Sequence, residues 1–149
     1  MMDETRFTIP VHYDSPRWRD PIRKGLIYSK IYPGLSPNHM PIRGAGTKTV
    51  RMEYVHLGRE ADNQEVIDEI ERHHRLPDRA EAETFLETNP DEQEKLQIVG
   101  ICGFGSMAIG DKEGVVYVGT EGKKRILDAK WQGEKWSKDC RFLAVCKTS

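Results

Sequence analysis

Apolar and polar residues alternate at both ends of the chain, whereas the middle has a helical spacing of apolar residues. Residues 7–13 alternate between apolar and polar side chains, which is the period of a half-buried strand. Pro10 lies within this run and lacks a backbone N–H donor, so we expect an edge strand here. Residues 49–57 alternate in the same way, with Val50, Met52 and Tyr54 on one face, and they predict a second strand.

Two helices are predicted between residues 62 and 88. Asp62 with Glu65, and Asp78 with Glu81, have the spacing of a capping box, in which the two side chains satisfy the first turn of a helix. Each pair precedes apolar residues at helical spacing, and Leu76-Pro77 separates the two runs. The apolar residues are Val66, Ile67 and Ile70 in the first helix and Ala82, Phe85 and Leu86 in the second. Asn89-Pro90-Asp91-Glu92 predicts a short third helix that ends near Leu96.

From Gln97 onward the pattern indicates strands again. We expect a strand at residues 98–101 that residues 106–109 continue, and further strands at 115–119, 124–131 and 141–146, with a hairpin turn around Glu121-Gly122. The order of strands, helices and strands predicts an α+β fold. Its sheet is expected to be mostly antiparallel, built from the N- and C-terminal strands and covered by two to three central helices.

Residues 14–46 are rich in proline and glycine, and we expect a long irregular loop there within one domain of residues 1–149. A helical turn is possible at 21–25. Loops of this length are uncommon in small domains and often carry function, so this loop is the first candidate for a binding surface.

Charge is unevenly distributed although the net charge is only −1. Residues 53–94 hold fourteen acidic residues and four arginines, whereas residues 123–147 hold eight Lys or Arg and three acidic residues. Such an asymmetry is typical of a nucleic-acid surface, but it is also typical of an acidic helical layer beside a basic sheet edge. A nucleic-acid-associated protein that uses residues 123–147 therefore stays open as one function.

The sequence also indicates the cellular compartment in which the protein is expected. No signal-peptide pattern is visible, and no apolar run approaches the roughly 18 residues of a membrane helix. The three cysteines lack Cys-x-x-Cys spacing, which suits a reducing environment. We expect a cytoplasmic protein without membrane partners.

Candidate catalytic and cofactor patterns are weak. Residues 103–108 match a Gly-x-Gly-x-x-Ala fingerprint, but no helix follows the glycines, so we expect no dinucleotide cofactor. His73-His74 at a predicted helix end would point about 100° apart and make a poor metal site, so no metal is expected. Cys102 and Cys146 lie in apolar runs typical of core cysteines. Cys140 with a histidine is the remaining candidate for an enzyme.

Tryptophans beside cations give the leading hypothesis. Aromatic residues and arginine are enriched at interfaces, and five such residues stand out. They are Arg17, Trp18, Arg19, Trp131 and Trp136. We therefore expect a non-enzymatic interaction or ligand-binding domain. The expected partner is another protein or a small ligand, held by the 14–46 loop and the C-terminal surface.

The C-terminal run Arg141-Phe-Leu-Ala-Val-Cys-Lys147, behind Trp131 and Trp136, resembles the ending of a family of short, uncharacterised bacterial proteins. The family typically has arginine where this chain has Cys146, and the resemblance implies no activity for any residue. A weaker likeness is to C-type-lectin-like domains, which the order of helix, Arg75-Leu-Pro77, helix, hairpins and final strand suits. Paired disulfides and a calcium-binding triplet are missing from the sequence. Fold-level likeness of this kind assigns no function.

Overall fold

The computed structural model of the chain describes residues 7–19, 28–33, 35, 37–89, 97–109, 111–121 and 124–147. The helices are α1 (Asn63–His73) and α2 (Arg79–Thr88), with short 3-10 turns η1 (Pro16–Arg19) and η2 (Pro37–His39). The strands are β1 (Phe7–His12), β2 (Lys30–Ile31), β3 (Thr47–Val55), β4 (Ala61–Asp62), β5 (His74–Arg75), β6 (Gln97–Ile109), β7 (Lys112–Glu121), β8 (Lys124–Trp131), β9 (Lys135–Trp136) and β10 (Cys140–Cys146).

The α+β class is confirmed, but the prediction of a mostly antiparallel sheet is wrong because the sheet is mixed. Its strand order is β1-β3-β10-β6-β7-β8-β2, and β5 pairs with β10. β10 runs parallel to β6, and β2 runs parallel to β8. The chain reaches β10 by crossing back over the β6–β7–β8 meander through β9, rather than by a tight hairpin. A connection of this kind leads to parallel pairing, which the spacing of apolar residues does not reveal.

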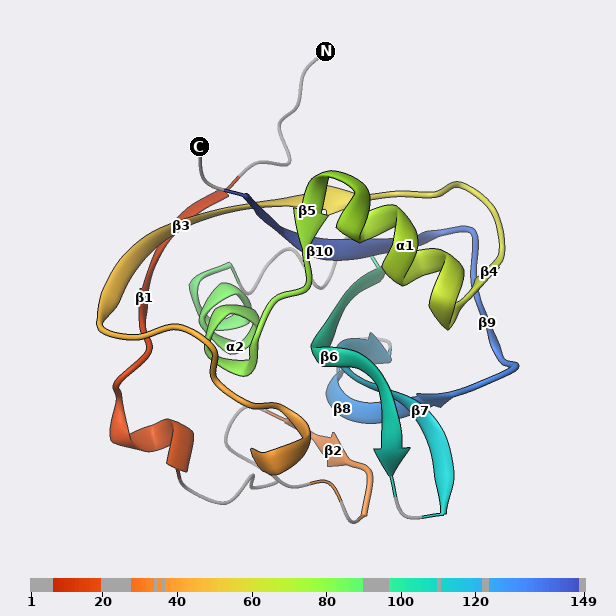
Figure 1. Ribbon diagram of the computed structural model, residues 1–149, viewed down its shortest axis with the longest axis horizontal. Coiled ribbons are helices and arrows are strands. Elements are labelled where there is room, and N and C mark those ends of the chain that lie inside the picture. The colour runs from red at the N-terminus through yellow and green to blue at the C-terminus, as the bar shows by residue number, and fades with distance from the viewer. Residues whose placement is uncertain are drawn as a thin grey trace.

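The sheet curves around α2, while α1 lies on its opposite face (Figure 1). Successive residues of β10 divide between the two cores: Leu143 and Val145 pack on the α2 side, and Phe142 and Ala144 pack on the α1 side. This is the alternation of side chains expected for a strand with both faces covered.

Most of the other predicted elements are confirmed. β1 lies at an edge of the sheet, as Pro10 indicated, and β3 turns Val50 and Met52 into the core. β7 and β8 form the expected hairpin, and both helices start with the expected capping boxes. The predicted third helix at residues 90–96 and the turn at 21–25 lie outside the described residues. None of the helices in the described ranges is long and apolar enough to span a membrane.

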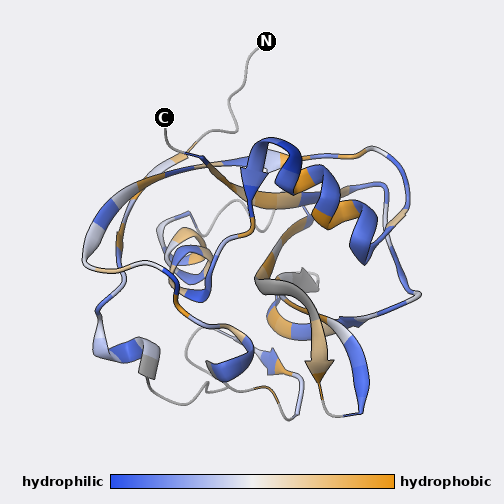
Figure 2. Cartoon of the chain, viewed as in Figure 1, coloured by the Kyte–Doolittle hydropathy of each residue, from blue (hydrophilic) through white to orange (hydrophobic). Residues whose placement is uncertain are grey.

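The two helices differ in how their hydropathy relates to their burial. α1 turns an apolar stripe toward the sheet and a polar face outward (Figure 2). α2 is largely hydrophilic in the same view, yet seven of its residues are buried, including Arg79, Glu81 and Glu83. The segments on either side of α2 therefore have to supply partners for buried charges.

Candidate functional site

A groove lies where β3 continues past the end of β10. β10 pairs with β3 only at residues Met52–Val55, so the earlier part of β3 extends beyond its neighbour. The groove has a volume of about 450 Å³ and is open to solvent. It is lined by Tyr13, Arg43, Gly44, Lys48, Thr49, Val50, Arg51, Arg75, Asp78, Val145, Cys146 and Lys147.

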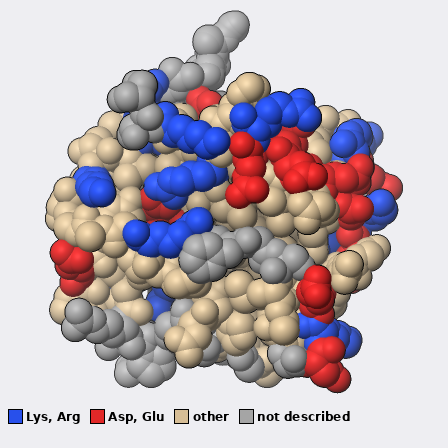
Figure 3. Space-filling model, viewed as in Figure 1, with Lys and Arg blue, Asp and Glu red and all other residues tan. Residues whose placement is uncertain are grey.

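The lining of the groove is strongly cationic. The described lining residues include five Lys or Arg side chains and a single carboxylate, Asp78. In the view of Figure 3, Lys and Arg side chains form neighbouring rows on one part of the surface, whereas Asp and Glu side chains gather mainly around α1. Lys48 and Arg51 are exposed, and among the described residues no carboxylate forms an ion pair with either. The positive potential of these two side chains is therefore directed to solvent.

The acidic residues at the floor of the groove are already bonded. Asp78 accepts from the backbone N–H groups of Arg43 (3.0 Å) and Glu81 (2.9 Å). Burial raises the pKa of Asp78, and the neighbouring Glu81 charge adds to this effect. Glu81 lies behind it and accepts from Arg75 and from the Tyr13 hydroxyl (2.6 Å). These carboxylates hold the wall of the groove together and neutralise Arg75, but they do not neutralise Lys48, Arg51 or Lys147.

The Tyr13 ring beside these carboxylates explains why a glycine stands at position 44. A Cβ at this position would lie 2.5 Å from ring atoms of Tyr13, well inside van der Waals contact. The chain therefore packs its backbone directly on the ring, and Arg43 Nη2 donates to the carbonyl of Leu76 at 2.9 Å. Both contacts fix the end of the 14–46 loop beside the groove.

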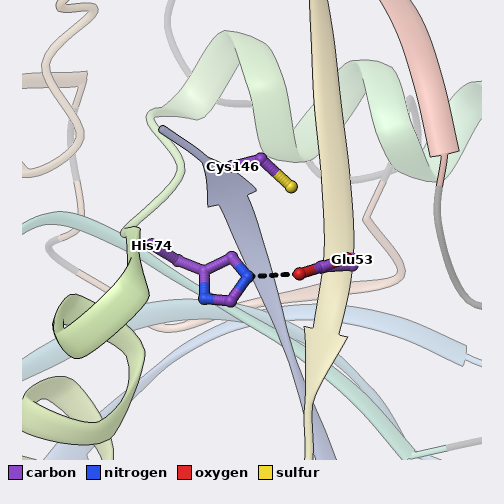
Figure 4. A group of neighbouring side chains, drawn as sticks. All are labelled: Glu53, His74 and Cys146. Atoms are coloured by element: carbon purple, nitrogen blue, oxygen red, sulfur yellow. Dashed lines mark hydrogen bonds and ion pairs between the residues drawn. The ribbon is translucent and has the colours of Figure 1, made fainter. Parts of the chain in front are cut away.

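A cluster of three chemically distinct side chains adjoins the groove. Glu53 of β3, His74 of β5 and Cys146 of β10 come from three neighbouring strands, and their side chains converge (Figure 4). One ligand-type atom from each lies within 4.8 Å of the others. His74 Nε2 is hydrogen-bonded to Glu53 Oε1 at 2.5 Å, and all three residues are half-buried. Cys146 belongs to both the cluster and the lining of the groove.

Sequence reasoning missed this cluster because it placed His74 on a helix. α1 ends at His73, and His74 pairs in register with Cys146 as part of β5. The 100° argument against a His73-His74 pair therefore does not apply to His74. Leu76-Pro77 indicates that the helix ends before Leu76, but the restriction falls on Leu76 and does not place His74 in a strand.

Two of the predicted interface tryptophans are buried. Trp18 is 6% exposed, and its Nε1 donates to the carbonyl of His12 at 2.7 Å. Trp136 is 4% exposed, and its Nε1 donates to Asn63 Oδ1 at 2.9 Å. Both indole N–H groups are thus used inside the fold, so these rings pack the domain and present little surface to a partner.

Trp131 is the partly exposed one of the three tryptophans. Its ring packs edge-on against Tyr32 of the 14–46 loop at 5.4 Å, with Lys112 Nζ 5.3 Å from the ring centroid. Arg17 bonds Glu87 through both terminal nitrogens, at 3.0 and 2.9 Å. The backbone of Arg19 ends η1, and its side chain lies outside the described residues.

The basic residues of 123–147 do not form one surface. They are spread over β8, β9, β10 and the segments that follow β9 and β10, and of the described ones only Lys147 lines the basic groove. Lys130 and Lys135 instead border a second, smaller groove of about 260 Å³ beside Trp136 and Cys140. The basic groove draws its other cations from segments 43–51 and 75, so counting charge along the chain did not reveal it.

The other two cysteines have environments typical of core thiols. Burial raises the pKa of Cys140, whose Sγ lies 3.7 Å from Gln97 Oε1. Burial also raises the pKa of Cys102, which is fully enclosed. No described histidine bonds to either sulfur, so the geometry gives no support to a Cys140–histidine site.

Comparisons with protein-family models, with curated proteins and with solved structures each found no match. The geometry of the groove and its cluster is therefore the basis for assigning a function.

Proposed function

We propose that this domain binds a small anionic ligand carrying phosphate groups in the groove between β3, β5 and the end of β10. The observation that carries this proposal is the gathering of five cations from separate segments around one cavity, with Lys48 and Arg51 directed to solvent. Such convergence is costly in self-repulsion unless an anion offsets it.

The size and chemistry of the groove favour phosphate over other anions. A volume of about 450 Å³ falls within the usual range for small-molecule sites. Arginine offers a planar fork of donors that matches phosphate oxygens, and lysine adds a compact charge. The lining supplies both kinds of cation from β3 itself, with Lys48 and Arg51 three residues apart along the strand.

A small ligand fits the groove better than a nucleic-acid strand does. Binding of single strands usually requires aromatic rings on which bases stack. Among the described lining residues the aromatic one is Tyr13, which is buried beneath Gly44 and bonded to Glu81. No ring among the described lining residues is therefore free to stack a base.

Isothermal titration of tripolyphosphate into the chain tests the proposal. Arg51→Gln and Lys48→Gln are each expected to weaken binding by about tenfold, since a hydrogen bond to a charged group contributes about 1.5–3 kcal/mol. Arg141→Gln and Lys138→Gln remove the same charges outside the groove and are expected to change the affinity less than twofold. Equal losses in all four variants, or no binding at low salt, would contradict a defined site.

The interaction surface predicted around the 14–46 loop and Trp131 is compatible with this site, because Arg43 and Gly44, near the end of that loop, line the groove. The likeness to C-type-lectin-like domains stays a prediction. The order of α1, the link at Arg75-Leu76-Pro77, α2, the β7–β8 hairpin and β10 supports it.

A further inference from the structure

We infer that Glu53, His74 and Cys146 form a binding site for a divalent transition-metal ion, with zinc as the best match. This inference goes beyond anion binding and does not depend on it. It stands on the convergence of three ligand-type side chains from β3, β5 and β10 (Figure 4).

The backbone brings these side chains together in a fixed way. β10 pairs with β3 on one side and with β5 on the other, and Cys146 is in register with His74. Ala144 is in register with Glu53 and lies two residues before Cys146 on β10, so Glu53 projects on the same face of the sheet as Cys146. Sites built on paired strands hold their ligands more rigidly than loops do.

The distances suit a tetrahedral ion after a small adjustment. The three ligand-type atoms lie within 4.8 Å of one another. Bonds of about 2.0–2.3 Å to nitrogen, oxygen and sulfur place tetrahedral ligand atoms roughly 3–4 Å apart. Rotation of the side chains that moves the ligand atoms by about 1 Å closes this difference, and the ion would take the place of the His74–Glu53 hydrogen bond.

The donor set selects the class of metal. A thiolate and an imidazole favour zinc or another late transition metal, whereas calcium and magnesium favour sites made of oxygen. Thiolate and carboxylate together carry two negative charges, which offset the two positive charges of the ion. Three protein ligands leave one position of a tetrahedron open, as in catalytic rather than structural zinc sites.

The arrangement also has a purely structural explanation. A His–Glu hydrogen bond with a cysteine packed beside it requires no metal, and the side chains of His74 and Glu53 are 15% and 20% exposed. Cobalt separates the two explanations because Co²⁺ bound to a thiolate absorbs in the near ultraviolet, and tetrahedral Co²⁺ absorbs strongly in the visible.

The experiment titrates Co²⁺ into chelator-treated, reduced full-length chain and follows both absorption bands. Wild type is expected to develop them with one equivalent and to lose them when Zn²⁺ is added. Cys146→Ser is expected to abolish the thiolate band, and His74→Gln and Glu53→Gln to weaken the affinity at least tenfold. His73→Gln and Cys140→Ser are matched controls, because each removes the same side-chain type outside the cluster.

The inference is overturned if wild type shows no thiolate band, if the band persists in Cys146→Ser, or if His73→Gln weakens binding as much as His74→Gln does. Circular dichroism of each variant confirms that it is folded, and binding by the conservative His74→Cys variant would support direct ligation. Tripolyphosphate titration of the metal-free chain is a separate readout, so loss of the metal site leaves the anion-binding proposal intact.

Discussion

α1 and α2 begin with the same capping box but are stabilised in different ways. In α1, Asp62 and Glu65 bond each other's backbone, and the Glu65 side chain is 42% exposed. In α2, Asp78 and Glu81 make the same two bonds, but Glu81 is fully buried and also accepts from Arg75 and Tyr13. The same local pattern thus serves as a surface cap in one helix and as the centre of a buried network in the other.

The difference arises from the segments that surround each helix. α1 lies against the sheet with an apolar stripe and leaves its charges in water. α2 is enclosed by the sheet and the 14–46 loop, so its charges need internal partners: Glu83 accepts from the Tyr28 hydroxyl at 2.8 Å and from Arg79 Nε at 2.9 Å. Among the described residues, no buried side-chain nitrogen or oxygen lacks a hydrogen-bond partner. The buried carboxylates therefore attach the long loop to the domain.

This comparison also separates structural charges from candidate functional ones. The charges around α2 are paired and serve packing, whereas Lys48 and Arg51 in the groove are exposed and have no carboxylate partner among the described residues. Charges without internal partners are the ones available to a ligand.

The largest expected effect is that of Glu81→Gln compared with Glu65→Gln. Glu81→Gln leaves Arg75 without its counter-charge in a partly buried setting, and it should lower the free energy of unfolding by about 3 kcal/mol. Glu65→Gln alters the equivalent position of α1 and should have a far smaller effect, because water screens an exposed pair. Urea unfolding of both variants measures the difference. Equal losses would show that burial does not make Glu81 more important to stability than Glu65.

An intermediate effect is expected for Tyr28→Phe, which removes one hydroxyl that joins the loop to α2. A hydrogen bond to a buried carboxylate contributes about 1.5–3 kcal/mol, so unfolding should become easier by an amount in that range. Tyr32→Phe removes a hydroxyl from the same loop at a partly exposed ring and should change stability by less than about 0.5 kcal/mol. If the two variants are equally stable, the loop is not held through Glu83.

Much of this fold could be predicted from the sequence, but the arrangement of charges around α2 could not. Capping boxes and apolar spacing are local signals, and both helices were found from them. The partners of Glu81 and Glu83 are not local: Tyr13 is 68 residues away from Glu81, and Tyr28 is 55 residues away from Glu83. Acidic residues on an amphipathic helix ordinarily face water, which holds for Glu65 of α1 but not for Glu81 and Glu83 of α2.

The candidate site could not be predicted from the sequence for the same reason: its residues are not local to one another. Glu53, His74 and Cys146 are widely separated in sequence, and two-residue strands such as β5 carry no periodic pattern. The groove combines cations from an otherwise acidic stretch, Arg75, with others from the end of a proline-rich loop, Arg43. Only the pairing of β10 with both β3 and β5 brings these residues together.

The smallest expected effect is a dependence of the free energy of unfolding on pH. It is caused by Tyr28, the loop residue whose hydroxyl bonds to Glu83 of α2. Burial, followed by the charge of Glu83, raises the pKa of Tyr28 well above its ordinary value of 10.0. In the unfolded chain this phenol ionises near pH 10, whereas in the folded chain it keeps its proton. A raised folded pKa means that the contribution to stability is complete below pH 10 and is lost progressively above it.

The difference in stability between wild type and Tyr28→Phe should therefore narrow as pH rises. Between pH 9.5 and 10.5 the linkage relation predicts a decrease of about 0.7 kcal/mol for one tyrosine that ionises only when unfolded. Urea unfolding of both proteins at these two pH values measures it, and the difference cancels contributions from Tyr13, which both chains retain. A constant difference across this range would mean that Tyr28 ionises in the folded state, and hence that α2 and its loop open to water more readily than their buried contacts imply.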